Sequence, residues 1–276
     1  MRLENGGTRE YVLGHSESEL IRLERQAEIF AEPTEQLLRR AGVGRGMRVL
    51  DIGCGVGDVA MAAARLVGAG GSVLGIDRAG EALGIAARRA ERAGFSWLTY
   101  EAADLHEFEP QERFDAITGR FILMYLTDPA ATIRRLSGFL KPGGVLAFAE
   151  LDIDQAGSLP ELPLLLKIIH WTTATYRCAG IEPNMGSKLF AAFSAAGMSS
   201  TLVGTTRIEG GENSAVYDFA AETIRSLLPS IIQFGIATEA EVGLDTLVER
   251  LHAAATAQPH CFFLPRLVGG FARPRS

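Results

Sequence analysis

The sequence contains few cysteines and no long apolar run. Its three cysteines, Cys54, Cys178 and Cys261, are far apart and form no Cys-x-x-Cys pair. An odd number of separated cysteines argues against a disulfide framework and favours a reducing compartment. No run of about 18 uncharged apolar residues occurs, and the N-terminal MRLENGGTRE lacks the apolar stretch of a signal peptide. We therefore expect a soluble, cytoplasmic protein that does not span a membrane.

Basic runs are also lacking. The chain has 27 Lys and Arg against 33 Asp and Glu, a net charge of −6. Because the long-range field of such a protein repels a polyphosphate, nucleic acid is not an expected partner. We expect a small-molecule substrate and a monomer or homodimer.

The 276 residues are 47% apolar, which is enough for one large core or a core with an accessory lobe. Ser16 and Glu19 have the spacing of a capping box, and apolar residues follow on one helical face as far as Phe30. Pro33 is expected to end this helix, with a second short helix over 34–41.

From residue 48 onward, short apolar runs alternate with helical patterns, which is typical of a parallel sheet covered on both faces. The expected strands lie near 47–53, 72–77, 96–102, 114–119, 145–151, 201–208 and 261–272. The expected helices cover 58–67, 79–93, 128–139, 164–179 and 186–196, with LKPGG (140–144) as a turn and 152–163 as a loop.

The pattern predicts an α/β fold: a Rossmann-like, seven-stranded, mostly parallel sheet with helices on both faces and a helical cap. Residues 1–45 are interpreted as an N-terminal helical lid and 46–151 as the cofactor-binding core. Residues 152–276 would complete the sheet and carry cap insertions at about 155–185 and 212–258 for the substrate.

Glycine recurs at alternate positions in VLDIGCGVGD (49–58), where a strand turns into a helix. Glycines at such a turn permit positive φ and let a ligand lie against the backbone. The dinucleotide fingerprint G-x-G-x-x-G/A, counted from Gly53, requires Gly or Ala at position 58, where this chain has Asp58. With Asp51 just ahead of the turn, the composition favours a cationic or zwitterionic ligand and argues against a Rossmann oxidoreductase.

The same stretch resembles the first motif of class I S-adenosylmethionine-dependent methyltransferases. SVLGID (72–77), AADL (102–105), FDAITGRFILMYL (114–126) and LKPGG follow in the order of that family. The resemblance implies S-adenosyl-L-methionine as cofactor, with Asp77 on the ribose hydroxyls, Asp104 and Leu105 at the adenine, and backbone carbonyls around Gly119 and Arg120 facing the methionine. The cofactor-binding residues that it implies in this core are Asp51, Gly53, Cys54, Gly55, Asp77, Arg78, Ala103, Asp104, Leu105, Gly119 and Arg120.

The stretch YVLGHSESELIRLERQAEIF resembles the leading helix of a bacterial subset of small-molecule methyltransferases, in which it folds over the cofactor. That resemblance implies that Tyr11 and Gln26 face the methionyl group and that Arg22 meets its carboxylate. A solvated amphipathic helix, with Arg22 paired to Glu19 or Gln26, is the alternative.

The expected function is transfer of a methyl group from S-adenosyl-L-methionine to a small, largely apolar molecule by in-line displacement, which mainly requires alignment. No catalytic residue is assigned. Candidates for a base are Tyr125, Asp152, His170 and His15. The structural alternatives are a histidine packed in an aromatic helix for His170 and a capping or loop carboxylate for Asp152. Candidates for an apolar pocket are Trp171, Tyr176, Phe262 and Phe263, which are also typical core residues.

Two alternatives stay open, a catalyst from a different class and a specific rival methyltransferase. Some relatives use the sulfonium charge to catalyse cyclisation or decarboxylation without methyl transfer. An arsenic methyltransferase would use several convergent thiolates, but Cys54 and Cys261 have the pattern of small core residues, and no metal site is expected.

Overall fold

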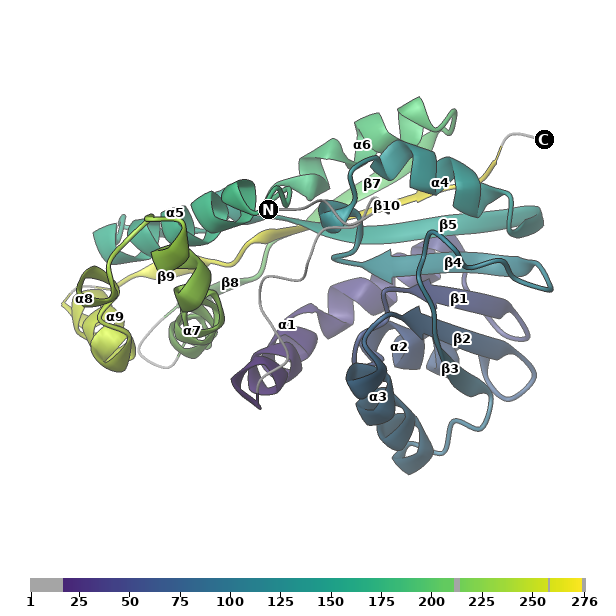
Figure 1. Cartoon of the computed structure of the whole chain (residues 1–276), viewed down its shortest axis with the longest axis horizontal. Coiled ribbons are helices and arrows are strands. Elements are labelled where there is room, and N and C mark those ends of the chain that lie inside the picture. Colours follow the sequence, from purple (N-terminus) through teal and green to yellow (C-terminus); the bar gives the residue numbers. More distant parts are fainter. Residues whose placement is uncertain (1–16, 211–213, 258, 275–276) are drawn as a thin grey trace.

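A seven-stranded sheet forms the centre of the protein, in the order β3-β2-β1-β4-β5-β10-β7 (Figure 1). The computed structural model describes residues 17–210, 214–257 and 259–274, with side chains from Arg25 onward. The strands of this sheet are β1 (Arg48–Ile52), β2 (Ser72–Asp77), β3 (Leu98–Ala102), β4 (Phe114–Arg120), β5 (Leu140–Asp152), β7 (Ser200–Thr205) and β10 (Arg266–Ala272). The predicted fold class is confirmed.

Strands β3, β2, β1, β4 and β5 run parallel, so their carboxyl ends meet at one edge of the sheet. β10 returns antiparallel between β5 and β7. In a parallel sheet this edge is the usual place for a ligand, because the loops that leave the strands converge there. The glycine turn after β1 and Asp77 at the end of β2 both lie at this edge.

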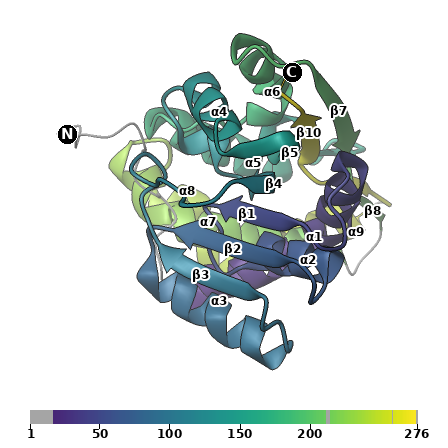
Figure 2. The ribbon, with the colours of Figure 1, turned by 90° about the vertical axis from the view of Figure 1, so that its right-hand side faces the viewer.

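Helices cover both faces of the sheet (Figure 2). Two consecutive glycines of β10 mark the faces: a Cβ on Gly269 would meet Leu37 on one face, and a Cβ on Gly270 would meet Phe193 on the other. The helices of this part are α1 (Glu17–Ala41), α2 (Asp58–Val67), α3 (Gly80–Arg92), α4 (Pro129–Ser137) and α6 (Met185–Ala195). α1 packs with α2 on the first face, whereas α4 packs with α6 on the second.

The expectation that Pro33 ends a helix is wrong, because α1 continues through it to Ala41. Proline removes one backbone donor from a helix, and the hydroxyl of Thr34 donates a 2.6 Å hydrogen bond to the carbonyl of Phe30 at this point. Apolar residues on both sides of Pro33, including Phe30 and Leu37, are buried. Packing against the sheet therefore outweighs the local cost of the proline.

A cap stands beyond the carboxyl edge of the sheet, at the left of Figure 1. Its helices are α5 (Pro163–Cys178), α7 (Val216–Gln233), α8 (Glu239–Val242) and α9 (Leu247–Thr256), and its three-stranded sheet contains β6 (Gly157–Leu159), β9 (Cys261–Phe263) and β8 (Ile208–Gly210). Three 3-10 turns complete the described elements: η1 (Leu123–Tyr125), η2 (Ile153–Gln155) and η3 (Leu244–Thr246).

Four sequence boundaries are corrected by this arrangement. The expected strand 201–208 contains most of β7 and reaches the first residue of β8, which belongs to the cap sheet. The stretch 261–272 contains two strands on either side of Pro265: β9, which pairs within the sheet of the cap, and β10, which pairs within the large sheet. The LKPGG turn is part of the long strand β5, which has a register irregularity opposite Phe114 and Ala116. The expected loop 152–163 contains the strand β6.

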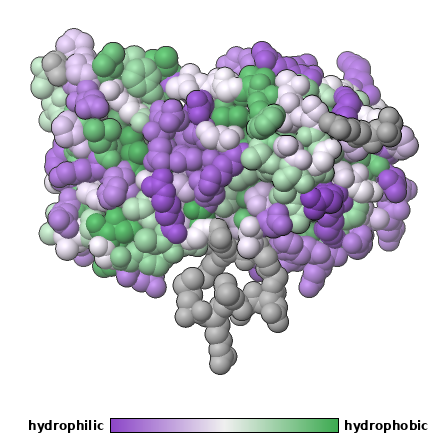
Figure 3. Space-filling model, turned by 90° about the horizontal axis from the view of Figure 1, so that it is seen from above, coloured by the Kyte–Doolittle hydropathy of each residue, from purple (hydrophilic) through white to green (hydrophobic). Residues whose placement is uncertain are grey.

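The face that carries α4, α5 and α6 shows hydrophilic and hydrophobic residues intermixed (Figure 3). Among the described residues, no helix has the length and apolar character needed to cross a membrane.

Candidate active site

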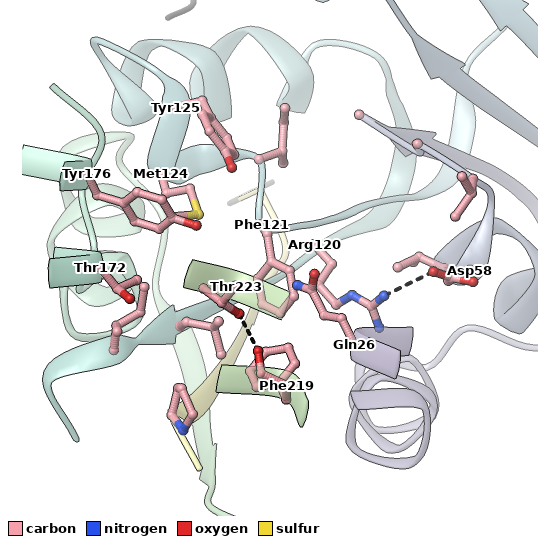
Figure 4. Close-up of a pocket in the computed structure, with 18 of the residues that line it drawn as sticks. Gln26, Asp58, Arg120, Phe121, Met124, Tyr125, Thr172, Tyr176, Phe219 and Thr223 are labelled. Atoms are coloured by element: carbon pink, nitrogen blue, oxygen red, sulfur yellow. Dashed lines mark hydrogen bonds and ion pairs between the residues drawn. The ribbon is translucent and has the colours of Figure 1, made fainter. Parts of the chain in front are cut away.

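A cavity of about 580 Å³ lies between the carboxyl edge of the large sheet and the cap. This volume is within the usual range of small-molecule sites, about 300–1,000 Å³. Its wall has two parts, which meet near Phe121 in Figure 4. The inner half is formed by the loops after β1, β2, β3 and β4, and the outer half mainly by η1, α5 and α7.

The glycine turn forms the floor of the inner half. Gly53 and Gly55 have φ values of 60° and 50°, in the left-handed region that glycine adopts without a steric cost. A Cβ on Gly55 would meet nothing within 4 Å, whereas one on Gly53 would strike Ile122 and one on Gly57 would strike the ring of Tyr100. Gly55 therefore leaves open space for a ligand, while Gly53 and Gly57 allow close packing.

Asp77 is held over this turn by two backbone donors. One carboxylate oxygen accepts a hydrogen bond from the N–H of Gly55 (2.8 Å), and the other accepts one from the N–H of Ala79 (2.9 Å). A carboxylate has about four acceptor sites, so each oxygen can still accept a bond from a ligand hydroxyl. Asp77 lines the cavity.

The loop after β3 supplies the next part of the wall. Ala103 and Leu105 line the cavity, as does Arg78 from the loop after β2. Asp104 does not line it. Its carboxylate accepts a 2.7 Å hydrogen bond from the N–H of His106 and lies 3.5 Å from the guanidinium of Arg78.

A buried group of opposite charges closes the inner half. The guanidinium of Arg120, 8% exposed, lies 3.6 Å from the Asp58 carboxylate and donates a 3.0 Å hydrogen bond to Thr34 (Figure 4). Asp58 is also paired to Arg89 at 2.7 Å. Burial lowers the pKa of Arg120, and the nearby carboxylates of Asp58 and Asp51 oppose this shift. Arg120 and Asp58 both line the cavity, so it presents both signs of charge to a ligand.

Asp51 and Gly119 lie behind the cavity wall. Asp51 is 1% exposed and no hydrogen bond of normal geometry reaches its carboxylate oxygens. Burial raises its pKa well above the usual value, and the charge of Arg120 opposes this rise only in part. Gly119 packs against Ile122 and Ile52, with no room for a side chain. In contrast, Cys54 is among the residues that line the cavity.

Helix α1 reaches the cavity through Gln26, which is buried and lies beside Arg120 in Figure 4. Next to Gln26, Arg25 forms ion pairs with Glu222 (3.0 Å) and Asp218 (3.2 Å) on α7. α1 therefore lies against the cap as well as the sheet.

The structure describes only part of the segment before Gln26, so only part of the expectations for this segment can be compared with it. Tyr11 and His15 lie outside the described residues, and Arg22 is described only in its backbone, as part of α1.

The outer half is apolar with a few hydroxyl groups. Thr172 and Thr223 donate hydrogen bonds within their own helices, to the carbonyls of Ile168 (2.9 Å) and Phe219 (2.7 Å). Tyr125 and Tyr176 stand on the opposite side of the cavity from Phe219 (Figure 4). The residues that line this half are Phe121, Ile122, Met124, Tyr125, Leu151, Ile153, Ala156, Leu165, Ile168, Ile169, Thr172, Tyr176, Val216, Phe219, Ala220, Thr223, Phe263, Leu264 and Pro265.

Two of the candidate bases lie elsewhere. Asp152 is 1% exposed and accepts hydrogen bonds from the backbone and hydroxyl of Ser187 and from Arg266, so it ties α6 to β10. His170 is on the exposed side of α5, which also corrects its alternative role as a packed core histidine. Tyr125 is the candidate base that the structure brings into the cavity.

The four aromatic candidates divide evenly. Tyr176 and Phe263 line the cavity, whereas Trp171 and Phe262 are buried in the core outside its wall. Helical spacing explains this division on α5. Tyr176 lies four residues after Thr172 and therefore on the same helical face, whereas Trp171 directly precedes Thr172 and lies on a different face.

Several cavity residues were missed by the sequence interpretation. On α7, Val216, Phe219, Ala220 and Thr223 have spacings of three and four residues, the pattern of one helical face. This spacing is visible in the sequence, but it does not tell a face that packs in the core from one that lines a cavity. Asp58 also lines the cavity, but the sequence interpretation used it only as a carboxylate that would repel a pyrophosphate.

The three free cysteines lie apart, in the glycine turn, on α5 and on β9. Within the described part of the chain, no three His, Cys, Asp or Glu side chains are placed to hold a metal ion.

The inner half fits S-adenosyl-L-methionine. Gly55 leaves space against the backbone, Asp77 offers two oxygens to a diol, Ala103 and Leu105 form an apolar wall for a flat ring, and Arg120 with Asp58 suits an amino-acid zwitterion.

Comparisons with known proteins agree with this geometry. A family described as "Methyltransferase domain" matches residues 44–194, more than half of the chain. The Ubiquinone biosynthesis O-methyltransferase of Bradyrhizobium sp. (strain ORS 278) is 34% identical over 107 residues, which cover 39% of this chain and 41% of that protein. The chain thus matches less than half the length of this curated relative.

Solved structures share the fold over most of the chain. The YcgJ protein of Bacillus subtilis superposes with a TM-score of 0.56 at 20% identity, covering 89% of this chain and 100% of that one. The [4+2]-cyclase SpnF superposes with a TM-score of 0.52 at 22% identity, covering 89% and 81%.

The chain belongs to the methyltransferase domain family and has the fold of class I S-adenosylmethionine-dependent methyltransferases. Its cofactor is S-adenosyl-L-methionine, and the inner half of the cavity is the part of the structure that fits it.

Proposed function

We propose that this protein transfers the methyl group of S-adenosyl-L-methionine to a small, largely apolar molecule held in the outer half of the cavity. The observation that carries the proposal is the outer wall itself, in which apolar side chains from η1, α5 and α7 surround a few hydroxyl groups. Such a wall holds a ligand mainly by shape, with the hydroxyls fixing its orientation.

When bound, the cofactor supplies an activated methyl group on a sulfonium. We propose that Asp77 binds the ribose hydroxyls, that Ala103 and Leu105 pack on the adenine, and that Arg120 binds the methionyl carboxylate. Gln26 would cover this end from α1. The contribution of the protein is then alignment of the acceptor with the methyl group at about 3–3.5 Å, together with exclusion of water.

Tyr125 is the proposed proton acceptor or orienting group when the nucleophile is a hydroxyl. It is 8% exposed, lines the outer half, and belongs to the turn that follows β4. The fold similarity to a [4+2]-cyclase keeps cyclisation or decarboxylation as the alternative reaction at the same site.

One experiment separates these reactions. The purified protein is incubated with methyl-labelled cofactor and with quinone, polyketide and phenolic acceptors, alongside RNA and protein substrates. Label in a small apolar product supports the proposal. Label only in RNA or protein contradicts it, and a changed acceptor without label establishes the alternative.

The acceptor found in this way then tests the outer half. Phe219 on α7 lines it, and truncation of a large side chain opens space around the ligand. We expect Phe219→Ala to raise the KM of the acceptor at least tenfold with little change for the cofactor. Phe190→Ala on α6, an exposed aromatic at 60%, is the control and should change neither KM.

We also propose that the protein works in the cytoplasm as a monomer or homodimer, without a nucleic-acid partner. The net charge of −6 and the three free cysteines support this proposal.

A further inference from the structure

Glu150 is a buried carboxyl group that takes no part in the proposed chemistry and does not line the cavity. It lies near the end of β5, opposite Val268 of β10, and is 0% exposed. One carboxylate oxygen accepts hydrogen bonds from the backbone N–H groups of Ile122 (3.1 Å) and Leu123 (2.8 Å). A buried carboxyl is costly unless such bonds compensate it, so its position calls for an explanation.

The segment that Glu150 holds is the part of the wall shared by both halves of the cavity. Between β4 and η1 the chain turns sharply at Phe121, a non-glycine residue with a φ of 57°. A non-glycine residue in this left-handed region is strained and persists only when its surroundings fix it. The N–H of Phe121 donates to the carbonyl of Ala149, the residue before Glu150. The end of β5 thus holds the turn at Phe121, Ile122 and Leu123.

Ile122 connects this segment to the cofactor turn. A Cβ on Gly53 would lie 2.6 Å from Ile122 Cδ1, and a Cβ on Gly119 would lie 2.9 Å from Ile122 Cγ2. The Ile122 side chain therefore fills the space that both glycines leave open. Any movement of Ile122 changes the support of the glycine turn.

The following residues, Met124 and Tyr125, face the outer half of the cavity. They belong to η1, a single 3-10 turn whose first N–H groups have no partner within the turn. Glu150 provides that partner from the neighbouring strand.

We propose that Glu150 is a positioning residue of the active site: its carboxyl fixes residues 121–125, so that Ile122 braces the cofactor turn and Met124 and Tyr125 face the acceptor. The part that concerns the acceptor rests on the proposed function, whereas the part that concerns the cofactor turn does not. Burial raises the pKa of Glu150 to about 8, and the backbone hydrogen bonds from Leu123, Ile122 and Met124 oppose this rise only in part. An apolar residue at this strand position would avoid that cost but would leave the N–H groups unpaired.

The test uses Glu150→Leu, which keeps the size of the side chain and removes both acceptors, and Glu150→Gln, whose carbonyl can still accept both bonds. S-adenosylhomocysteine is the probe, and calorimetry with amide hydrogen exchange provides the readout. In Glu150→Leu we expect the amides of Ile122 and Leu123 to exchange at least tenfold faster and the Kd of the probe to rise at least fivefold. Glu150→Gln should stay within twofold of wild type.

The matched control is Asp152→Asn, two residues further along β5. Asp152 is as deeply buried, but its carboxylate ties α6 to β10, and Asp152 itself does not line the cavity. Asp152→Asn should lower the thermal midpoint and leave the Kd of the probe within twofold of wild type. If it weakens the probe as much as Glu150→Leu does, Glu150 acts only through stability and the proposal is overturned.

Glu150→Asp covers the case in which Glu150→Leu does not fold. The shorter side chain withdraws the carboxylate from Ile122, so we expect about a threefold rise in the Kd of the probe and faster exchange at Ile122. Binding and exchange as in wild type would overturn the proposal. Because the probe and the exchange need no acceptor, failure of the methyl-transfer screen would leave this test intact.

Discussion

The carboxylate of Asp77 accepts a 2.8 Å hydrogen bond from the backbone N–H of Gly55 and so ties the end of β2 to the glycine turn after β1. The second oxygen is held by Ala79. The two strands are adjacent and parallel, so this bond forms at the carboxyl edge of the sheet, beside the inner half of the cavity. A carboxylate fixed in this way needs little reorganisation to receive two ligand hydroxyls.

Asp77→Ala should therefore weaken cofactor binding by about 2–4 kcal/mol, since it removes two charge-assisted hydrogen bonds and the tie to Gly55. Calorimetry with S-adenosylhomocysteine measures this loss. Asp115→Asn, a carboxylate at the other end of the sheet that binds the N–H of Arg48 and the ammonium of Lys141, is the control. Equal affinity of Asp77→Ala and wild type, with both folded, would remove Asp77 from the ribose site.

Arg120 provides a test that separates the two ends of the cofactor. If its guanidinium binds the methionyl carboxylate, Arg120→Met should weaken S-adenosylhomocysteine by about 1.5–3 kcal/mol, the range for a hydrogen bond to a charged group. Methylthioadenosine, which lacks the amino-acid group, should bind the variant and the wild type alike. Both ligands are measured by calorimetry on one preparation, so a general loss of structure would reveal itself as weaker binding of both.

Arg25 and Glu222 connect α1 to the cap beside the cavity, at an N–O distance of 3.0 Å with both side chains partly exposed. Partly exposed ion pairs contribute about 0.2–1 kcal/mol, so Arg25→Ala should change the free energy of unfolding little. If α1 closes over the cofactor, the variant should instead release S-adenosylhomocysteine several-fold faster in stopped-flow displacement. The pair Arg39 and Glu35, exposed on α1, is the control, and Arg39→Ala should leave the release rate unchanged.

Glu150 should make stability depend on pH in a defined direction. Its pKa is raised from 4.5 to about 8 by burial, so between these values the folded protein holds a proton that the unfolded chain has lost. This contribution is fully present below about pH 4.5 and is lost as the pH rises towards 8. From pH 6 to pH 8.5 it amounts to about 2–3 kcal/mol.

Urea unfolding of wild type and Glu150→Gln at these two pH values checks the effect. Between pH 6 and pH 8.5, the free energy of unfolding of the wild type should fall by about 2–3 kcal/mol relative to that of Glu150→Gln. A constant difference would show that Glu150 is already ionised at pH 6 in the folded protein.

The inner half of the site was largely predictable, because its residues fall within one stretch of chain. The positive φ of Gly53 and Gly55 is a local requirement that only glycine meets without strain. Asp77 ends the next strand, and parallel strands bring such ends together. The position of Ala103 and Leu105 follows in the same way from β3.

The outer half was not predictable to the same degree. The face of α5 that carries Thr172 and Tyr176 has the same spacing as a face that packs in a core. Trp171, an attractive pocket residue by its chemistry, lies one position before Thr172 and is directed into the core. Whether a face of α5 lines the cavity or packs in the core depends on the position of the cap relative to the sheet.

The sequence by itself determined the order of strands and helices in the core, the fold class and the cofactor turn, since apolar period and glycine conformation act over a few residues. Tertiary structure decided the rest. It carried α1 through Pro33 by burying Phe30 and Leu37, and it paired Arg120 with Asp58 across the cavity floor. Contacts between residues that are distant in the chain stabilise each of these features, and a local sequence pattern does not predict such contacts.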